Sequence, residues 1–201
     1  MTSLLKLARL IDRLNTFIAE KISWALMVAV LVCVGSALAS YFFKAGSNAW
    51  YELQWYLYAA MFLFSAPYTL RRNEHVRIDV ITHRFSKRTQ VWIDIFGFIF
   101  FLLPMAILIL YLSLPYALES IRSQEMSNNA GGLIVWPAKL MIPVGFFLLA
   151  LQGVSELVKR FAFLRGLIDA SEFEKASATP EEEIAAIRDA NLDKIKAIQS
   201  E

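Results

Sequence analysis

The stretch that decides the fold is WYELQWYLYAAMFLFSAPYTL, residues 50–70, followed directly by RRNEHVRID, residues 71–79. The first part is largely apolar, holds Glu52 as its one acidic side chain, and stops at Arg71 and Arg72. A helix in water keeps a polar face, whereas a helix in a membrane satisfies its backbone polar groups internally and places arginines at the headgroup level. This stretch therefore predicts a membrane-spanning helix followed by a basic loop.

The composition of the whole chain points to the same class of protein. Of its 201 residues, 57% are hydrophobic and 19% are charged, whereas soluble domains have about 45–50% apolar and about 25% charged residues. The net charge of +2 gives no long-range attraction for nucleic acid. We therefore expect an all-α integral membrane protein without a nucleic-acid partner.

The apolar residues are concentrated in four blocks, at residues 22–43, 50–70, 91–118 and 133–158. At a rise of about 1.5 Å per residue, about 20 helical residues cross a hydrocarbon layer of about 30 Å. An indole ring prefers the headgroup boundary, and a tryptophan stands near the N-terminal end of each block. These tryptophans are Trp24, Trp50, Trp92 and Trp136. The blocks predict a domain of four transmembrane helices over residues 22–168.

The third block is longer than one crossing requires, so we expect it to tilt, or to bend at Pro104 or Pro115. Five of the six prolines lie inside the apolar blocks. A proline within a helix leaves a backbone carbonyl without its usual partner, and neighbouring helices must then supply one. This pattern predicts a packed bundle or a partner protein.

Lysine and arginine are distributed unevenly among the connecting segments. Four lie in residues 1–21, six lie in residues 71–88, and three lie in residues 159–165. The other two connections, residues 44–49 and 119–132, carry one cation each. Because short loops rich in Lys and Arg stay in the cytoplasm, we expect both termini to be cytoplasmic.

The N-terminal segment, residues 1–21, has the pattern of an amphipathic helix. Its apolar stripe consists of Leu4, Leu7, Ile11, Leu14 and Ile18. The polar residues on the other side are Lys6, Arg9, Asp12, Arg13 and Thr16. A basic amphipathic helix next to a span typically lies flat in the membrane surface, and this is our prediction. The alternative is a helix that packs against a cytosolic partner protein.

The tail, residues 169–201, is highly charged and contains no apolar block. Thr179 followed by Pro180 and Glu182 matches a capping box with proline at the first helical position. This pattern predicts a short charged cytosolic helix. The alternative is a frayed tail, because short isolated helices are weak in water.

The usual sequence motifs of catalysis and cofactor binding are missing from the chain. Both histidines, His75 and His83, lie in one connecting loop, so the apolar blocks hold no axial ligand for a haem. No Cys/His cluster has zinc spacing, and no glycine-rich phosphate loop is present. We therefore expect a protein that is not an enzyme, with no catalytic or substrate-binding residue, no cofactor and no metal.

Ionisable side chains inside a membrane usually face protein or water, because their insertion costs about 2.5–3.5 kcal/mol at the bilayer centre. Here all four lie toward the ends of their blocks: Glu52 and Lys139 on the outer side, Asp94 and Glu156 on the inner side. We predict an ion pair between Glu52 and Lys139; the alternative is that Lys139 snorkels to the surface and Glu52 is hydrated. Without a file of acids across the membrane, neither an ion path nor a solute carrier is expected from this chain by itself.

The loop motif H-V-R-I-D, residues 75–79, combines a histidine, two apolar residues and an aspartate with its arginine. Cytoplasmic positive charge alone does not require this combination. A Glu early in the second block, an aromatic-rich span, two arginines and this motif together resemble the small membrane subunit of TRAP transporters, the DctQ family. The resemblance covers about residues 4–165 and leaves the tail after Asp169 unexplained.

This resemblance implies the small permease subunit of a binding-protein-dependent, sodium-coupled TRAP transporter that imports an organic acid across the bacterial inner membrane. The implied partners are a large membrane subunit, a periplasmic substrate-binding protein and phospholipids. The large subunit would move like an elevator, and the small one would brace it without binding substrate. The residues implied in subunit contacts, lipid contacts or folding are Glu52, Arg71, Arg72, His75, Arg77 and Asp79.

Two other functions stay open from the residues alone. A membrane anchor for a redox enzyme would bind haem or quinone, and the lack of histidines in the spans argues against it. A free-standing four-helix channel or sensor would conduct ions or respond to a signal without a partner protein.

Overall fold

The computed structural model describes residues 2–44, 46–72, 86–167 and 188. In these ranges the chain is helical and contains no strand, and an isolated bridge between Met126 and Ile134 is the one β-type pairing. The helices are α1 (Thr2–Ile22), α2 (Trp24–Phe43), α3 (Asn48–Arg71), α5 (Lys87–Gly97), the π-helix η1 (Phe98–Leu102), α6 (Leu103–Ser123) and α7 (Trp136–Leu164). The all-helical prediction is confirmed. The predicted tail helix over 169–201 lies outside the described residues, apart from residue 188.

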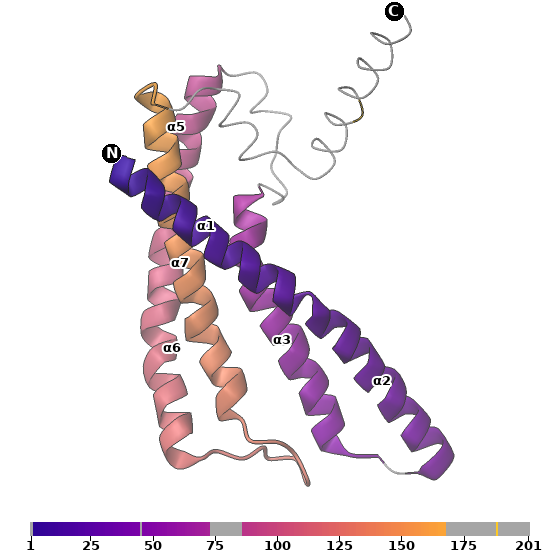
Figure 1. Cartoon of the computed structure of the whole chain (residues 1–201). Helices are drawn as coiled ribbons and strands as arrows, with labels where there is room; N and C mark the ends of the chain where they lie inside the picture. The colour runs from indigo at the N-terminus through magenta and orange to yellow at the C-terminus, as the bar shows by residue number, and fades with distance from the viewer. Residues whose placement is uncertain (1, 45, 73–85, 168–187, 189–201) are drawn as a thin grey trace, which may run out of the picture.

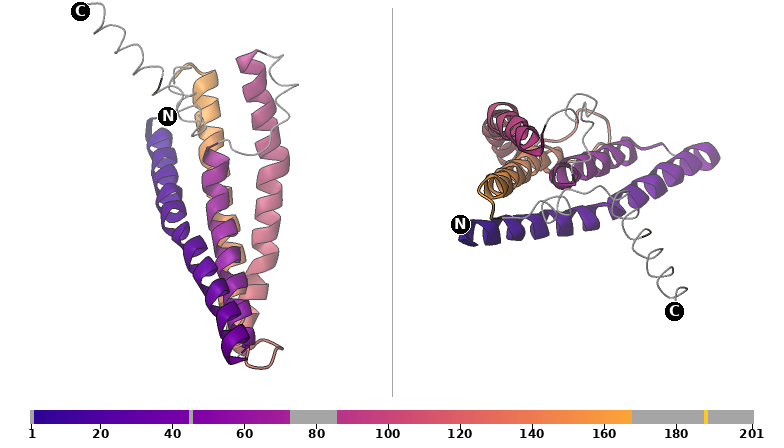
Figure 2. Two further views of the ribbon diagram at one scale, coloured as in Figure 1. Left: turned by 90° about the vertical axis from the view of Figure 1, so that its right-hand side faces the viewer. Right: turned by 90° about the horizontal axis from the view of Figure 1, so that it is seen from above.

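The long helices stand in a row, in which α2 packs on α3, α3 on α7, and α7 on α6. Helix α1 lies across α7 and α3 (Figure 1). Seen from above, α1 and α2 form a rod beside the layer of α3, α7 and α6 (Figure 2). The helices therefore form an open row and not a closed four-helix bundle, and most side chains of α2 are exposed.

By length and composition, three helical segments of the described chain can cross a membrane: Leu4–Phe43, Arg88–Ser123 and Trp136–Leu164. In the first two segments the apolar side chains are mostly exposed, as expected where lipid is the solvent, whereas in Trp136–Leu164 most are partly or fully covered by the rest of the chain. Helix α3 has 24 residues, which is long enough to span, but it is not among these three segments. It is rich in tyrosine and tryptophan, and several of its polar side chains bind other parts of the chain.

The long third block contains a π-helical turn, η1, directly before Pro104. Proline lacks the N–H that would bind the carbonyl four residues earlier, and a π-turn absorbs the misfit by widening the helix locally. A π-turn therefore precedes Pro104, whereas Pro115 lies within regular α6, and the expected tilt or bend of this block stays a prediction.

Helix α1 presents three faces, where the sequence pattern predicted two. Ala8, Asp12, Asn15 and Ala19 are buried against the rest of the chain. The apolar face stays exposed and includes Leu4, Leu7, Leu10, Leu14 and Phe17. The third face carries the exposed cations Lys6, Arg9 and Arg13. The assignment of Asp12 to a solvent-facing side is corrected: its charge is buried because residues of α7 pair with it.

Helices α3 and α7 approach closely at Gly145. A Cβ at this position would lie 2.8 Å from the Cβ of Leu63 and 3.2 Å from its carbonyl oxygen. Small residues let membrane helices bring their backbones together, which replaces the hydrophobic driving force that lipid removes. The α3–α7 contact therefore depends on the missing side chain of Gly145.

Replacement of Gly145 by alanine is expected to lower the free energy of unfolding by about 1–3 kcal/mol, because the new methyl group must push the backbone of Leu63 away. The measurement is reversible unfolding in mixed detergent micelles. Gly35→Ala in α2 is the matched control, because apart from the two adjacent residues and the nearby backbone of its own helix no described atom lies within 4 Å of the place that its new Cβ would take. Equal effects of the two substitutions would contradict close packing at Gly145.

Candidate functional site

A cluster of polar side chains lies where α1 crosses α7. Its members on these two helices are at most 9% exposed: Asp12, Asn15, Gln152, Ser155, Glu156, Lys159 and Arg160. Together with Asp94 of α5 they are called the α1–α7 cluster below. Buried charges are costly unless they are paired and hydrogen-bonded, so the contacts within the cluster decide what it does.

Asp12 joins α1 to α7. Its Oδ2 lies 3.0 Å from the ammonium of Lys159. Its Oδ1 accepts hydrogen bonds from the Ser155 hydroxyl at 2.9 Å and from the Gln152 amide at 2.8 Å. The Asn15 amide donates to the Oε1 atom of Gln152 at 2.7 Å. Two polar residues of α1 thus bind one face of α7, which fixes where α1 crosses the bundle.

Arg160 joins α7 to the α5–η1 segment. Its Nη1 donates to the Oε2 atom of Glu156 at 2.5 Å, and its Nε donates to the Oδ2 atom of Asp94 at 3.2 Å. The guanidinium carbon lies 4.5 Å from the centre of the Phe98 ring, within cation–π distance. Glu156 also pairs with Lys159. Arg160 therefore pairs at once with the buried Glu156 and the half-buried Asp94.

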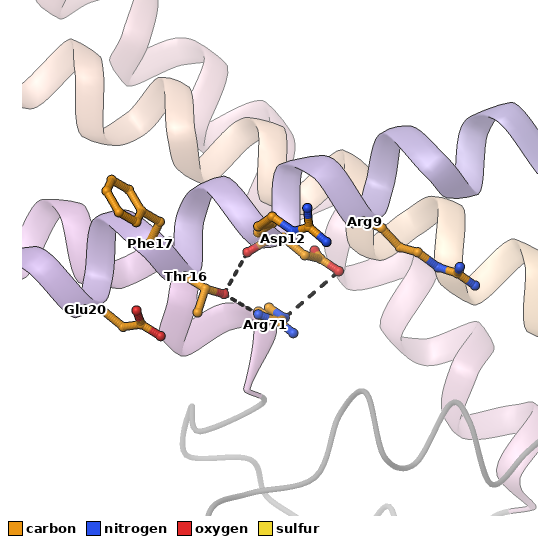
Figure 3. Close-up of a pocket in the computed structure, with 7 residues that line it drawn as sticks. Arg9, Asp12, Thr16, Phe17, Glu20 and Arg71 are labelled. Atoms are coloured by element: carbon orange, nitrogen blue, oxygen red, sulfur yellow. Dashed lines mark hydrogen bonds and ion pairs between the residues drawn. The ribbon is translucent and has the colours of Figure 1, made fainter.

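Arg71 extends this network to α3. Its Nη1 donates to the Thr16 hydroxyl, and its Nε lies 4.0 Å from the Oδ2 atom of Asp12 (Figure 3). With Arg71 included, the three acids of the network face three cations. Helices α1, α3, α5 and α7 are thereby tied together by paired charges.

A second polar cluster lies at the opposite ends of the helices, where the loop between α6 and α7 meets the start of α3. Glu52 is only 6% exposed there. Its Oε1 accepts hydrogen bonds from the Ser127 hydroxyl and, at 2.9 Å, from the Asn129 amide. Its Oε2 accepts one from the backbone N–H of Leu133 at 2.6 Å. This arrangement is called the Glu52 cap below.

The Glu52 cap needs glycine at position 132. A Cβ there would lie 2.7 Å from the Oε1 atom of Glu52 and 2.6 Å from the Cβ of Ser127. The hydroxyl of Tyr56 and the amide of Asn48 bind further carbonyls of the same loop, at 3.0 and 2.9 Å. The loop is therefore held as a folded lid over the end of α3.

The predicted ion pair between Glu52 and Lys139 is corrected by the structure, which gives the two side chains different partners. The ammonium of Lys139 lies 2.5 Å from the Oε2 atom of Glu125 and 4.0 Å from the centre of the Tyr116 ring. The loop between α6 and α7 folds back over the start of α3, and its own backbone and polar side chains bind the carboxylate of Glu52. Lys139 consequently pairs with the acid at the beginning of that loop.

The Glu125–Lys139 pair predicts a pH-dependent stability. The hydrogen bond from Lys139 holds the pKa of Glu125 below its ordinary value. The pair therefore stabilises the fold above the ordinary glutamate pKa, and this contribution is lost as the pH falls through the lowered pKa. Glu125→Gln is expected to lower the Tm at neutral pH and to equal the wild type in acid. A Tm difference that is independent of pH would contradict the pairing.

The structure describes only some of the predicted motif residues. Arg72 donates to the Tyr68 hydroxyl at 3.0 Å and lies 5.6 Å from its ring centre, so it caps the end of α3. Arg71 belongs to the network around α1, and Glu52 belongs to the cap at the far end, so the structure does not bring these motif residues together. The remaining predicted residues, His75, Arg77 and Asp79, lie outside the described residues.

Sequence reasoning missed the largest polar site of the described chain, the α1–α7 cluster. A signal was present in the fourth block, where Gln152, Ser155, Glu156 and Lys159 follow one another at helical spacing. Residues three and four apart share one face of a helix, so this pattern marks a polar stripe. The count of Lys and Arg in each connecting segment does not reveal this polar stripe, because the count assumes that Lys159 is exposed to water.

What these clusters can do chemically follows from their place and partners. Among the described residues, no group of His, Cys, Asp or Glu is suited to hold a metal ion. In the α1–α7 cluster the acids bind cations near the C-terminal end of α7, whereas Glu52 binds neutral donors near the start of α3. Such an arrangement fixes helices relative to each other.

Comparison with known proteins gave one finding. The family model described as the DctQ component of tripartite ATP-independent periplasmic transporters matches residues 28–163, which is more than half of the chain. No curated protein and no solved structure matches the chain.

Proposed function

Since this chain belongs to the DctQ family of tripartite ATP-independent periplasmic (TRAP) transporters, we propose that it braces the large membrane subunit of such a transporter. The family is one of transporter components and not of enzymes. In the proposed complex the chain enlarges the static scaffold, while the large subunit binds and moves the substrate.

One observation carries this proposal: the described buried charges have partners within the chain, and the helix surfaces between the two sites are largely apolar. The partners are opposite charges in the α1–α7 cluster and neutral donors in the Glu52 cap. Both the α1–α7 cluster and the Glu52 cap join segments far apart in the sequence. Interhelical polar contacts and close packing stabilise a membrane protein where lipid gives no hydrophobic drive. This arrangement is typical of a rigid scaffold and not of a path for substrate.

We propose four membrane spans. Three lie in the three apolar segments named above, and α3 is the additional one. Helix α2 packs along α3, and the Glu52 cap and Arg71 mark the two ends of α3. The count of Lys and Arg puts the Arg71 end in the cytoplasm, and both termini with it. Helix α1 then lies at the inner membrane surface, and the tail 169–201 lies in the cytoplasm.

The proposed transporter works in the bacterial inner membrane. Its further partners are a periplasmic binding protein, which delivers an organic acid, and phospholipids around the helices. Sodium coupling and substrate binding are assigned to the large subunit. Within this chain, the proposed residues of subunit contact or folding remain Glu52, Arg71, Arg72, His75, Arg77 and Asp79.

The experiment that tests the assembly is purification of the tagged full chain from its native membrane in mild detergent. The expected result is a stable complex with a much larger multi-span membrane protein, identified by mass spectrometry. A monodisperse oligomer of this chain with no second protein would contradict the proposed function. Arg160→Ala in the same experiment is expected to reduce recovery of the complex, because the frame loses its buried pairing.

A further inference from the structure

A cavity of about 440 Å³ lies between α1 and the end of α3. The residues that line it are Arg9, Asp12, Arg13, Thr16, Phe17, Glu20 and Arg71. Figure 3 shows Arg71 reaching from the end of α3 to the side of α1, where it meets Thr16 and Asp12. The cavity is thus built by two elements, and the contact of Arg71 fixes one of its walls.

The charge of the cavity favours an anion. Three arginines face it, against the carboxylates of Asp12 and Glu20. Asp12 is shared by Lys159 at 3.0 Å and Arg71 at 4.0 Å, and the five charged side chains of the lining together carry one net positive charge. The guanidinium group presents several N–H donors in a planar fork that matches the oxygens of a phosphate. An anionic group with phosphate-like oxygens therefore fits this site better than a neutral or cationic one.

The surface beside the cavity is apolar. Phe17 lines the cavity and is 58% exposed, and Leu10 and Leu14 of the same helix are 62% and 45% exposed. Exposure of these side chains to water is unfavourable, and they lie on the same helix as Arg9 and Arg13 of the cavity wall. A ligand with a charged head and apolar chains would contact both surfaces, whereas inorganic phosphate would contact only the first.

We propose that this cavity binds the headgroup of an anionic phospholipid, whose acyl chains lie along Leu10, Leu14 and Phe17. Basic pockets beside membrane helices on the cytoplasmic side are suited to such headgroups. Bound there, the lipid fills the space between α1 and α3 and holds α1 in the membrane surface. The proposal shares the surface position of α1 with the proposed function, but it concerns lipid binding and not the partner subunit.

The test is native mass spectrometry of the full chain, in the complex in which it is isolated, titrated with phosphatidylglycerol or phosphatidylcholine. The wild type is expected to retain phosphatidylglycerol in preference to phosphatidylcholine. Arg13→Gln should weaken retention about fivefold, the factor that corresponds to about 1 kcal/mol for a basic residue near an anionic surface. Arg13→Lys keeps the charge and should retain most of the binding.

Two controls separate the cavity from general surface charge. Lys6→Gln removes a cation of α1 that does not line the cavity, and it should leave lipid retention unchanged. Glu20→Gln removes an acid from the cavity wall and should strengthen retention, so the proposal stays testable even where Arg13→Gln fails to fold. Thermal unfolding of each variant reports whether the fold is intact.

Three outcomes would overturn the proposal. Equal losses in Lys6→Gln and Arg13→Gln would mean that diffuse charge alone attracts lipid. Displacement of the lipid by inorganic phosphate at comparable concentration would make free phosphate the ligand. Weaker assembly of the Arg13→Gln complex, with lipid retention unchanged, would assign the cavity to an acidic segment of a partner protein. The lipid site is supported if Arg13→Gln weakens lipid retention and Glu20→Gln strengthens it, whether or not the large subunit co-purifies.

Discussion

Arg160→Ala is expected to lower the free energy of unfolding by about 3–5 kcal/mol. The side chain is 2% exposed and pairs with both Glu156 and Asp94. Removal of one partner from a buried ion pair leaves the other charge without compensation. The alanine also removes the contact with the Phe98 ring. Reversible unfolding in mixed detergent micelles measures the effect.

The controls for this prediction separate charge from packing. Arg160→Lys keeps the positive charge but loses the planar fork that serves two acids, so an intermediate loss is expected. Arg122→Ala makes the same chemical change at an exposed position on α6, and it should stay within about 0.5 kcal/mol of the wild type. Similar losses at positions 122 and 160 would show that the cluster contributes nothing specific.

Glu52→Ala and Glu52→Gln are both expected to release the loop between α6 and α7, with a loss of Tm of about 5 °C or more. All three partners of the carboxylate are donors: the Ser127 hydroxyl, the Asn129 amide and the Leu133 N–H. Glutamine replaces one acceptor oxygen by an NH₂ group, so one of these donors would face another donor. Glutamine is therefore no adequate substitute for the carboxylate.

This pattern distinguishes the Glu52 cap from an ion pair with Lys139. In an ion pair, glutamine would still accept a hydrogen bond from the ammonium, and only alanine would be strongly destabilising. Glu119→Gln, at an exposed acid on α6, is the matched control for loss of charge. A wild-type Tm for Glu52→Gln, combined with a low Tm for Glu52→Ala, would argue against the three-donor cap.

The helical architecture could be predicted from the sequence because it depends on local properties. Long apolar blocks and the absence of a period-two pattern indicate helices, and the predicted block 50–70 agrees with α3 to within two residues at each end. Helix α7 extends to Leu164, beyond the predicted end at residue 158. The predicted span ends at residue 158 because the prediction assumes that Lys159 and Arg160 are exposed to water. In the structure their charges are paired inside the protein.

The partners within the polar clusters could not be predicted, because they come from distant parts of the chain. Asp12 has the sequence pattern of a solvent-facing residue of an amphipathic helix, and its partner Lys159 lies 147 positions away. Depth along a span suggested Lys139 as the partner of Glu52. The actual partner was decided by the folded loop, where Gly132 allows a close approach that no pattern of charges reveals.

The central claim, a membrane brace that moves no solute by itself, is tested most directly by uptake into proteoliposomes. Vesicles receive this chain alone, its co-purifying large subunit alone, or both, with the binding protein and a labelled organic acid outside under an inward sodium gradient. The account predicts uptake with both membrane subunits and none with this chain alone. Solute uptake by this chain in the absence of any other protein would contradict it.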